Sequence, residues 1–128
     1  MGTVVAIILG SHSDWPTIEP CYQQLQEFEI SVEVQVLSAH RTPDQLREFV
    51  ISSEDRVGVF VAAAGMAAAL PGAVAAHTVR PVIGIPVAAG PLQGVDSLLS
   101  MVQMPPGVPV ATVAIGSAGA RNAAILAA

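Results

Sequence analysis

The sequence VVAIILGSHSDW, residues 4–15, joins an apolar β-forming run to a short polar segment and then to a helix-like stretch. The same order recurs at residues 32–43, where the run VEVQVL precedes the polar segment SAHRTP. Polar residues that directly follow a strand lie at its carboxyl end, the edge where open α/β sheets bind ligands. The two segments therefore predict one shared crevice for a small molecule. The arginine in the second segment favours an anionic substrate.

Strand-like and helix-like segments alternate along the whole chain. Five runs rich in Val and Ile predict strands at Val4–Leu9, Val32–Leu37, Val57–Ala62, Val82–Val87 and Val110–Ile115. They are apolar at odd and even positions, which is typical of parallel strands covered on both faces. The helix-like segments are Pro16–Phe28, Pro43–Ser52, Ala67–His77, Leu92–Met104 and Ala118–Ala128. This alternation predicts an α/β fold of three layers, a single flavodoxin-like domain with a five-stranded parallel sheet in the order 2-1-3-4-5, because a barrel needs a longer chain.

Composition bounds the class of protein. The chain has 128 residues, of which 52% are hydrophobic and only 12% charged, against about 25% charged in a typical soluble domain. So few charges cannot cover the surface of a small monomer, so a homo-oligomer is expected. A membrane protein is the alternative, but every apolar run is interrupted well short of the ~20 residues that a span needs. A net charge of −5 argues against binding of nucleic acid.

The residue types present exclude several chemistries. The five basic residues other than histidine are all arginines, and the absence of lysine excludes a Schiff base and a P-loop. The single cysteine, Cys21, excludes an internal disulfide and is expected to pack as a small hydrophobic side chain. No clustered metal-binding motif occurs, so a dedicated metal site is not expected. The N-terminus lacks a basic leader, and the run at residues 4–9 is too short for a secretory signal, which predicts a cytoplasmic protein.

The first polar segment carries two hydroxyls and a carboxylate. Ser11, Ser13 and the free backbone N–H groups at a helix start could bind an anion. Asp14 would repel a phosphate and is better suited to accept hydrogen bonds from ribose hydroxyls or from an amine. In the alternative interpretation, Ser13 or Asp14 only caps the helix.

The second polar segment places an imidazole beside a guanidinium, with Ser38 just before them. His40 can donate and accept protons near neutral pH, and Arg41 can hold a phosphate through two parallel hydrogen bonds. The alternative is a surface pair of Arg41 with Asp44 or Glu48 and a structural role for His40. We favour function for this pair, because it follows a strand at the ligand-binding edge.

The remaining segments give weaker predictions. Thr42 is expected to cap the following helix, and the histidines at positions 12 and 77 are expected to be structural. The Ala- and Gly-rich residues 62–72 could pack a helix on the sheet or line a dry pocket. Residues 86–103 could form a lid or an oligomer contact.

The chain resembles the family of N5-carboxyaminoimidazole ribonucleotide mutases of purine biosynthesis. The motifs that carry this resemblance are GSHSDW at 10–15, SAHRTP at 38–43, LPG at 70–72, PVIGIPV at 81–87 and GVDSLLSMVQMPPGVPVATVAIG at 94–116. The resemblance implies a flavodoxin-like fold, an octamer and no cofactor. It also implies a reaction that moves a carboxylate from the exocyclic nitrogen of a phosphorylated aminoimidazole riboside to carbon 4 of its ring, through CO2.

Site roles follow from the resemblance, motif by motif. It implies that His40 is the general acid and base, that Ser38 and Arg41 contact the phosphate, and that Ser11, Ser13 and Asp14 bind the ribose and phosphate region. Ala64, Gly65 and Leu70 would border the pocket for the ring and the carboxylate. The chain departs from the family at Ala69, where most members have a histidine, and it ends at Ala128, where the family usually continues with a further helix.

Two other functions remain as alternatives. The related aminoimidazole ribonucleotide carboxylase uses free CO2, and the Leu70-Pro71-Gly72 sequence resembles the mutase branch more than the carboxylase branch. A non-catalytic ribotide-binding protein or scaffold subunit is the other alternative, to which Ala69 and the short C-terminus point.

Overall fold

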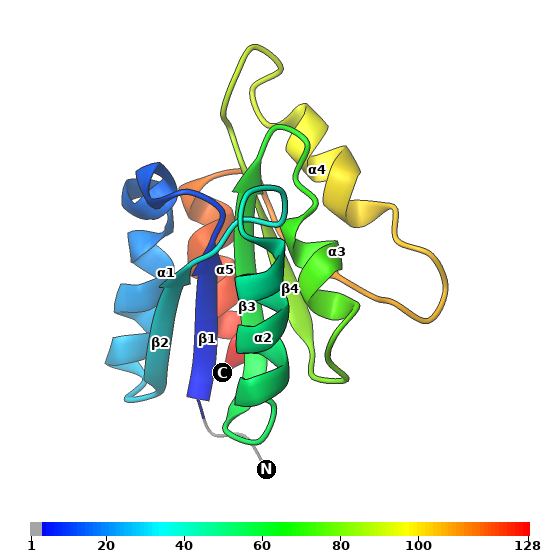
Figure 1. Cartoon of the computed structure of the whole chain (residues 1–128). Helices are drawn as coiled ribbons and strands as arrows, with labels where there is room; N and C mark the ends of the chain where they lie inside the picture. The colour runs from blue at the N-terminus through cyan, green and yellow to red at the C-terminus, as the bar shows by residue number, and fades with distance from the viewer. Residues whose placement is uncertain (1–3) are drawn as a thin grey trace.

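A computed structural model describes residues 4–128 and contains one five-stranded sheet. The strands follow the order β2-β1-β3-β4-β5, and each neighbouring pair runs parallel, which confirms the predicted topology. Their bounds are β1 (Val4–Leu9), β2 (Ser31–Val36), β3 (Val57–Gly65), β4 (Val82–Val87) and β5 (Ala111–Thr112). This order places the carboxyl ends of β2, β1 and β3 side by side (Figure 1).

Helices cover both faces of the sheet and complete the three predicted layers (Figure 1). Helices α1 and α5 pack on one face, and α2, α3 and α4 pack on the other. Their bounds are α1 (Trp15–Glu27), α2 (Pro43–Ser53), α3 (Leu70–Ala75), α4 (Val95–Val102) and α5 (Ser117–Ala127), with a short 3-10 turn η1 (His12–Asp14) before α1. In residues 4–128, every helix falls short of the length and apolarity that crossing a bilayer requires.

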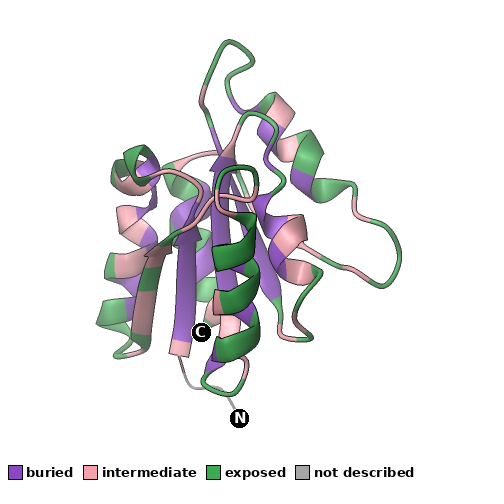
Figure 2. Ribbon diagram, in the orientation of Figure 1, coloured by how far each residue is buried: buried purple, intermediate pink, exposed green. Residues whose placement is uncertain are grey.

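The central strands carry the core because both of their faces are covered. Ile7 of β1 packs with α1 and α5, whereas its neighbour Ile8 packs with α2 and α3, and both are fully buried. Phe60 of β3 is also fully buried. Burial of one such side chain contributes about 1.5–3 kcal/mol to folding. Figure 2 shows the resulting buried strands β1, β3 and β4 between helices whose outer faces are exposed.

Strand β2 departs from the prediction that all strands are covered on both faces. Val34 is 37% exposed and Val36 is 50% exposed, although both lie on the face shared with α1. The reason is the position of β2 at the edge of the sheet, where it has a partner on one side only. An alternating or apolar pattern does not reveal whether a strand is central or at an edge.

Strand β5 is also shorter than predicted, covering two residues in place of six. Pro86 of β4 explains the difference. In a parallel strand, the main-chain N–H and C=O of one residue point toward the same neighbouring strand. The Pro86 carbonyl accepts a hydrogen bond of 2.9 Å from the Gly116 N–H, so this residue faces the β5 side. Proline has no N–H to donate there, and regular pairing stops after Gly84–Thr112.

Three element boundaries differ from the prediction for local reasons. Strand β3 continues to Gly65, beyond the predicted end at Ala62, because its last residues pair with β4. Helix α3 accordingly begins at Leu70 and not at Ala67. Helix α4 begins at Val95, because Gln93 and Gly94 have left-handed backbones with φ of 54° and 91° that cannot continue a helix.

Candidate active site

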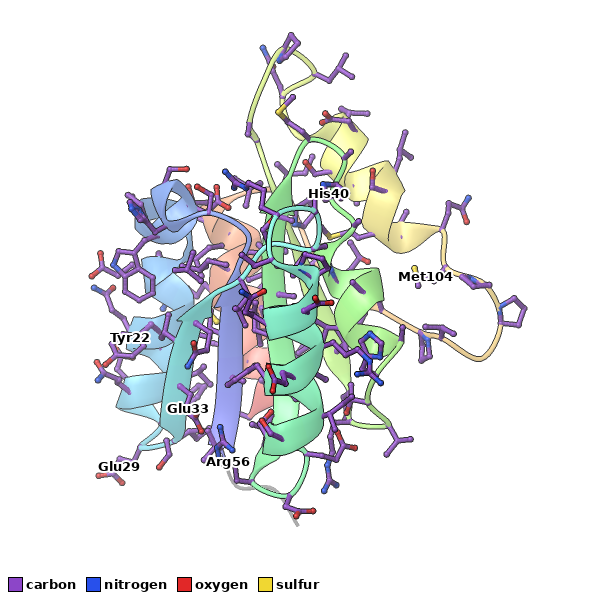
Figure 3. All side chains as sticks on the ribbon, viewed as in Figure 1. Tyr22, Glu29, Glu33, His40, Arg56 and Met104 are labelled. Carbon is purple, nitrogen blue, oxygen red and sulfur yellow. The ribbon has the colours of Figure 1, made fainter. Side chains whose placement is uncertain are left out.

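A cavity of about 500 Å³ lies at the carboxyl edge of the sheet. The loops after β1, β2 and β3 form its walls, and it contains every residue that the sequence placed at the site. Its lining comprises Gly10, Ser11, Ser13, Asp14, Ser38, Ala39, His40, Arg41, Ala64, Gly65, Met66, Ala67, Ala69, Leu70 and Ala89. Figure 3 shows His40 at this edge, above α2.

The first wall is the short turn that follows β1. The hydroxyls of Ser11 and Ser13 share a hydrogen bond of 2.8 Å, and the Ser11 oxygen also accepts the Ser13 N–H at 3.3 Å. Ser11 therefore caps the 3-10 turn. Asp14 stands at the cap position of α1 but makes no side-chain hydrogen bond to the helix backbone there. The interpretation of Asp14 as only a helix cap is therefore wrong, and Ser11 is the residue that caps.

Asp14 is the buried charge of the site, with 9% of its surface exposed. Burial raises the pKa of its carboxyl, because desolvation disfavours the charged form, and a backbone hydrogen bond with Ser11 opposes this in part. A ligand hydroxyl that donated to this carboxylate would replace the water that burial removed. This environment suits recognition of a sugar hydroxyl and disfavours a phosphate next to Asp14.

The second wall is a tight turn from Ser38 to Thr42. The Ser38 hydroxyl oxygen accepts the backbone N–H groups of His40 at 3.3 Å and Arg41 at 3.1 Å. Thr42 lies at the predicted N-cap position of α2, but its side chain makes no capping bond to the helix. Its hydroxyl instead accepts the Ser38 N–H at 2.8 Å and donates to the Ser38 carbonyl at 3.2 Å. The Thr42 side chain thus bonds to the backbone within the turn and not to the backbone of α2, as Ser and Thr side chains often do next to a helix start. They fix the backbone from which His40 and Arg41 extend.

Arg41 connects the second wall to the first. Its guanidinium Nη2 donates to the carbonyl oxygen of Gly10 at 3.3 Å, across 31 positions of sequence. The ion pairs found in residues 4–128 join Arg56 to Glu33 and Arg80 to Glu54. The alternative in which Arg41 pairs with Asp44 or Glu48 on the surface is therefore wrong. A guanidinium has five N–H donors, so others are left for an anionic ligand.

The third wall comes from the end of β3 and the loop that leads to α3. Ala64 and Leu70 are buried here, but Met66, Ala67 and Ala69 are exposed. In the single chain this wall is partly open to solvent, because its small side chains leave the rim uncovered. His40 is likewise exposed while lining the cavity.

Sequence reasoning did not assign Met66 or Ala89 to the site. Ala89 belongs to the loop after β4, which reaches the cavity because β4 lies beside β3. A Cβ atom built on Gly65 would lie only 2.8 Å from the Ala89 Cβ, which shows how closely this loop meets the end of β3. A glycine at the last position of the strand was the available signal for that approach.

Other candidate residues lie away from the cavity. His12 is exposed on η1, and His77 lies in a surface depression with Glu54 and Thr78, so neither lines the cavity. Burial raises the pKa of the Cys21 thiol to about 12, which keeps it protonated and unreactive near neutral pH. Residues 4–128 contain no group of three or more His, Cys, Asp or Glu side chains placed to hold a metal ion.

A doubly wound parallel sheet with a cavity at the carboxyl ends of its strands, lined on two sides by polar side chains, is typical of a flavodoxin-like protein that binds a small ligand. A model of the family described as AIR carboxylase matches residues 4–128. The chain belongs to the AIR carboxylase family.

Curated relatives and solved structures agree with this assignment. The N5-carboxyaminoimidazole ribonucleotide mutase of Vibrio parahaemolyticus serotype O3:K6 is 54% identical over 125 residues, covering 97% of this chain and 78% of the relative. The protein of the same name from Escherichia coli K12 is 53% identical over 125 residues, covering 97% and 74%. The crystal structure of Treponema denticola PurE superposes with a TM-score of 0.86 at 30% identity, covering 97% of this chain and 77% of that one. The resemblance seen in the sequence motifs is thus confirmed.

Proposed function

We propose that this protein is an N5-carboxyaminoimidazole ribonucleotide mutase of purine biosynthesis. The observation that carries the proposal is the cavity that His40 and Arg41 line together with Ser11, Ser13 and Asp14 and with an Ala- and Gly-rich wall. Relatives with the mutase name that are 53–54% identical over nearly the whole chain support it.

The polar walls fit the sugar phosphate end of the substrate. Arg41 and Ser38 would bind the phosphate, since a guanidinium matches two phosphate oxygens. Asp14 would accept from a ribose hydroxyl, as its buried carboxylate needs a donor, with Ser11 and Ser13 beside it. Ala64, Gly65 and Leu70 would border the aminoimidazole ring and its carboxylate, leaving the ring within reach of His40.

His40 would serve both proton steps of the reaction. Cleavage of the N–CO2 bond releases CO2 and leaves the electron pair on the exocyclic nitrogen, which takes a proton from the imidazolium. The ring carbon 4 then attacks CO2, and the neutral imidazole removes the proton of that carbon. Protons and carboxylate balance over the two steps, so no cofactor enters. The same side chain ends in the protonation state in which it began.

The assembly that we propose is a homo-octamer. Helix α4 and the loop before it expose large apolar side chains, among them Leu99 at 57%, Val95 at 53% and Leu92 at 60%. Val95 and Leu99 are four residues apart and so share one face of α4. Large apolar side chains exposed together on a small chain are typical of a protein–protein interface. The cytoplasm remains the predicted compartment.

Sedimentation velocity should give the mass of eight chains for the wild type. Leu99→Glu should shift the protein to smaller species, because a carboxylate in an apolar interface loses its solvation without a partner. Gln45→Glu on the exposed face of α2 is the control and should not change the mass. A wild-type monomer at micromolar concentration would contradict the proposed assembly.

Two observations keep other functions in view. The matching family model is described as AIR carboxylase, which suits an enzyme that uses free CO2. Ala69 lines the cavity where the resemblance implies a histidine, which suits a ribotide-binding homologue without turnover.

One assay separates the three functions. The purified protein is incubated with the N-carboxylated ribotide, and separately with aminoimidazole ribotide plus bicarbonate, while product absorbance is followed. We expect fast conversion of the N-carboxylated substrate only. Fast conversion of the second mixture alone would identify the carboxylase, and binding without turnover of either would identify the non-catalytic homologue.

A further inference from the structure

Met66 has an unusual backbone for its place in the cavity wall. Its φ is 54°, in the left-handed region that glycine adopts freely and that side chains with a Cβ atom rarely enter. Strained residues of this kind persist where the surrounding structure holds them, often at functional sites. Met66 lines the cavity and is 53% exposed, so packing in the core does not explain why this strained position carries a side chain.

The side chain of Met66 reaches across to another loop. A Cβ atom built on Gly90 would lie 3.4 Å from the Met66 Cγ, 3.5 Å from its Sδ and 3.6 Å from its Cε. The whole thioether arm therefore lies along Gly90, in the loop between β4 and α4 that rises above the sheet edge in Figure 1. Together with the close approach of Gly65 to Ala89, this contact joins the third wall of the cavity to that loop.

Met66 is also the longest apolar side chain available at the rim. Of the residues that line the cavity, only Met66 and Leu70 carry apolar side chains that extend beyond Cβ. Leu70 is 2% exposed and belongs to the core, so it cannot move over a ligand. An unbranched thioether has three rotatable bonds and adapts its shape to a neighbour. Met66 can therefore cover the small-residue wall that the alanines leave open.

We propose that Met66 is a positioning residue that holds the loop at residues 88–94 against the third wall and so keeps CO2 in the cavity between the two bond changes. This inference rests on the proposed mutase function, in which CO2 leaves the exocyclic nitrogen and must be captured by carbon 4. Escape of CO2 would leave aminoimidazole ribotide as a side product. The Met66 contact with Gly90 would set how often that escape happens.

Two variants test the proposal. Met66→Gly suits the left-handed backbone and removes the side chain, whereas Met66→Leu restores an apolar arm of similar length. Met104→Leu is the control, since Met104 contacts Gly72 and does not line the cavity. The catalytic readouts are the ribotide released per product formed and the incorporation of labelled bicarbonate into the product. The structural readout is amide hydrogen exchange in residues 88–94.

For Met66→Gly we expect release of ribotide and uptake of label to rise about threefold or more, with ribotide affinity within about twofold of wild type. Exchange in residues 88–94 should speed up about fivefold. Met66→Leu should bring ribotide release, label uptake and hydrogen exchange most of the way back to the wild-type values. Met104→Leu should change none of the three. Unchanged label uptake in an active Met66→Gly enzyme would overturn the role in retaining CO2.

Failure of the inference and failure of the proposed function are distinguishable. If the wild type binds the ribotide but turns over no substrate, the mutase function fails, and hydrogen exchange still tests the contact. Unchanged exchange in Met66→Gly would then show that Met66 does not hold the loop, whatever the activity.

Discussion

Replacement of His40 by Asn should lower kcat by about 10²–10⁴-fold, the usual contribution of a general acid–base group. Asn keeps a polar side chain of similar reach but can neither give nor take a proton near neutral pH. The ribotide should still bind within a few-fold of wild type. The turn that positions Arg41 is held by hydrogen bonds from the backbone N–H groups of His40 and Arg41 to the Ser38 hydroxyl, and these do not involve the imidazole.

The matched control for this variant is His77→Asn. His77 is exposed and lies outside the cavity, so its replacement should leave kcat and ribotide affinity unchanged. Single-turnover kinetics with the N-carboxylated substrate and a separate binding titration measure the two effects. Turnover of His40→Asn at the wild-type rate would remove the proton-transfer mechanism proposed for this site, even if the variant bound ligand normally.

Replacement of Arg41 by Ala should weaken ribotide binding by about 1.5–3 kcal/mol, or roughly 10- to 150-fold, if a charge-assisted phosphate contact is lost. Arg41 lines the cavity, and its side-chain hydrogen bond to the Gly10 carbonyl leaves other N–H donors free. The loss should shrink with rising salt, because screening already weakens the contact in the wild type.

Arg47→Ala controls for the loss of a positive charge. Arg47 is exposed on α2 and does not line the cavity, so affinity should stay near the wild-type value. Isothermal titration with the ribotide, and with the same riboside lacking its phosphate, locates the contact. If Arg41→Ala weakened both ligands equally, Arg41 would act by holding the Gly10 backbone and not by binding phosphate.

The fold was largely predictable because its determinants are local and repeated. Each β-forming run is followed by a helix, and parallel strands with such crossovers leave few topologies open. The prediction went wrong at β5 and β2, where pairing partners matter. Pro86 reads as part of a buried strand in sequence, and only its orientation toward β5 ends the ladder. Val36 reads as core, and only the edge position of β2 exposes half of it.

The candidate site was predictable for a different reason. Polar residues directly after β1 and β2 had to lie at one edge, since the sheet order places these strands side by side. That argument brought Ser11, Asp14, His40 and Arg41 to one cavity. It could not find Met66, whose relevance comes from a left-handed backbone and a contact with Gly90, 24 positions away in sequence.

The residues alone determined the strand–helix alternation, the edge that carries the polar side chains and the chemistry those side chains offer, because periodicity and functional groups are properties of short segments. Tertiary structure decided which carbonyl Arg41 reaches, how far Asp14 is buried and which side chain lies over Gly90. These depend on distances between segments remote in sequence, and those distances exist only once the sheet has aligned the loops at its edge.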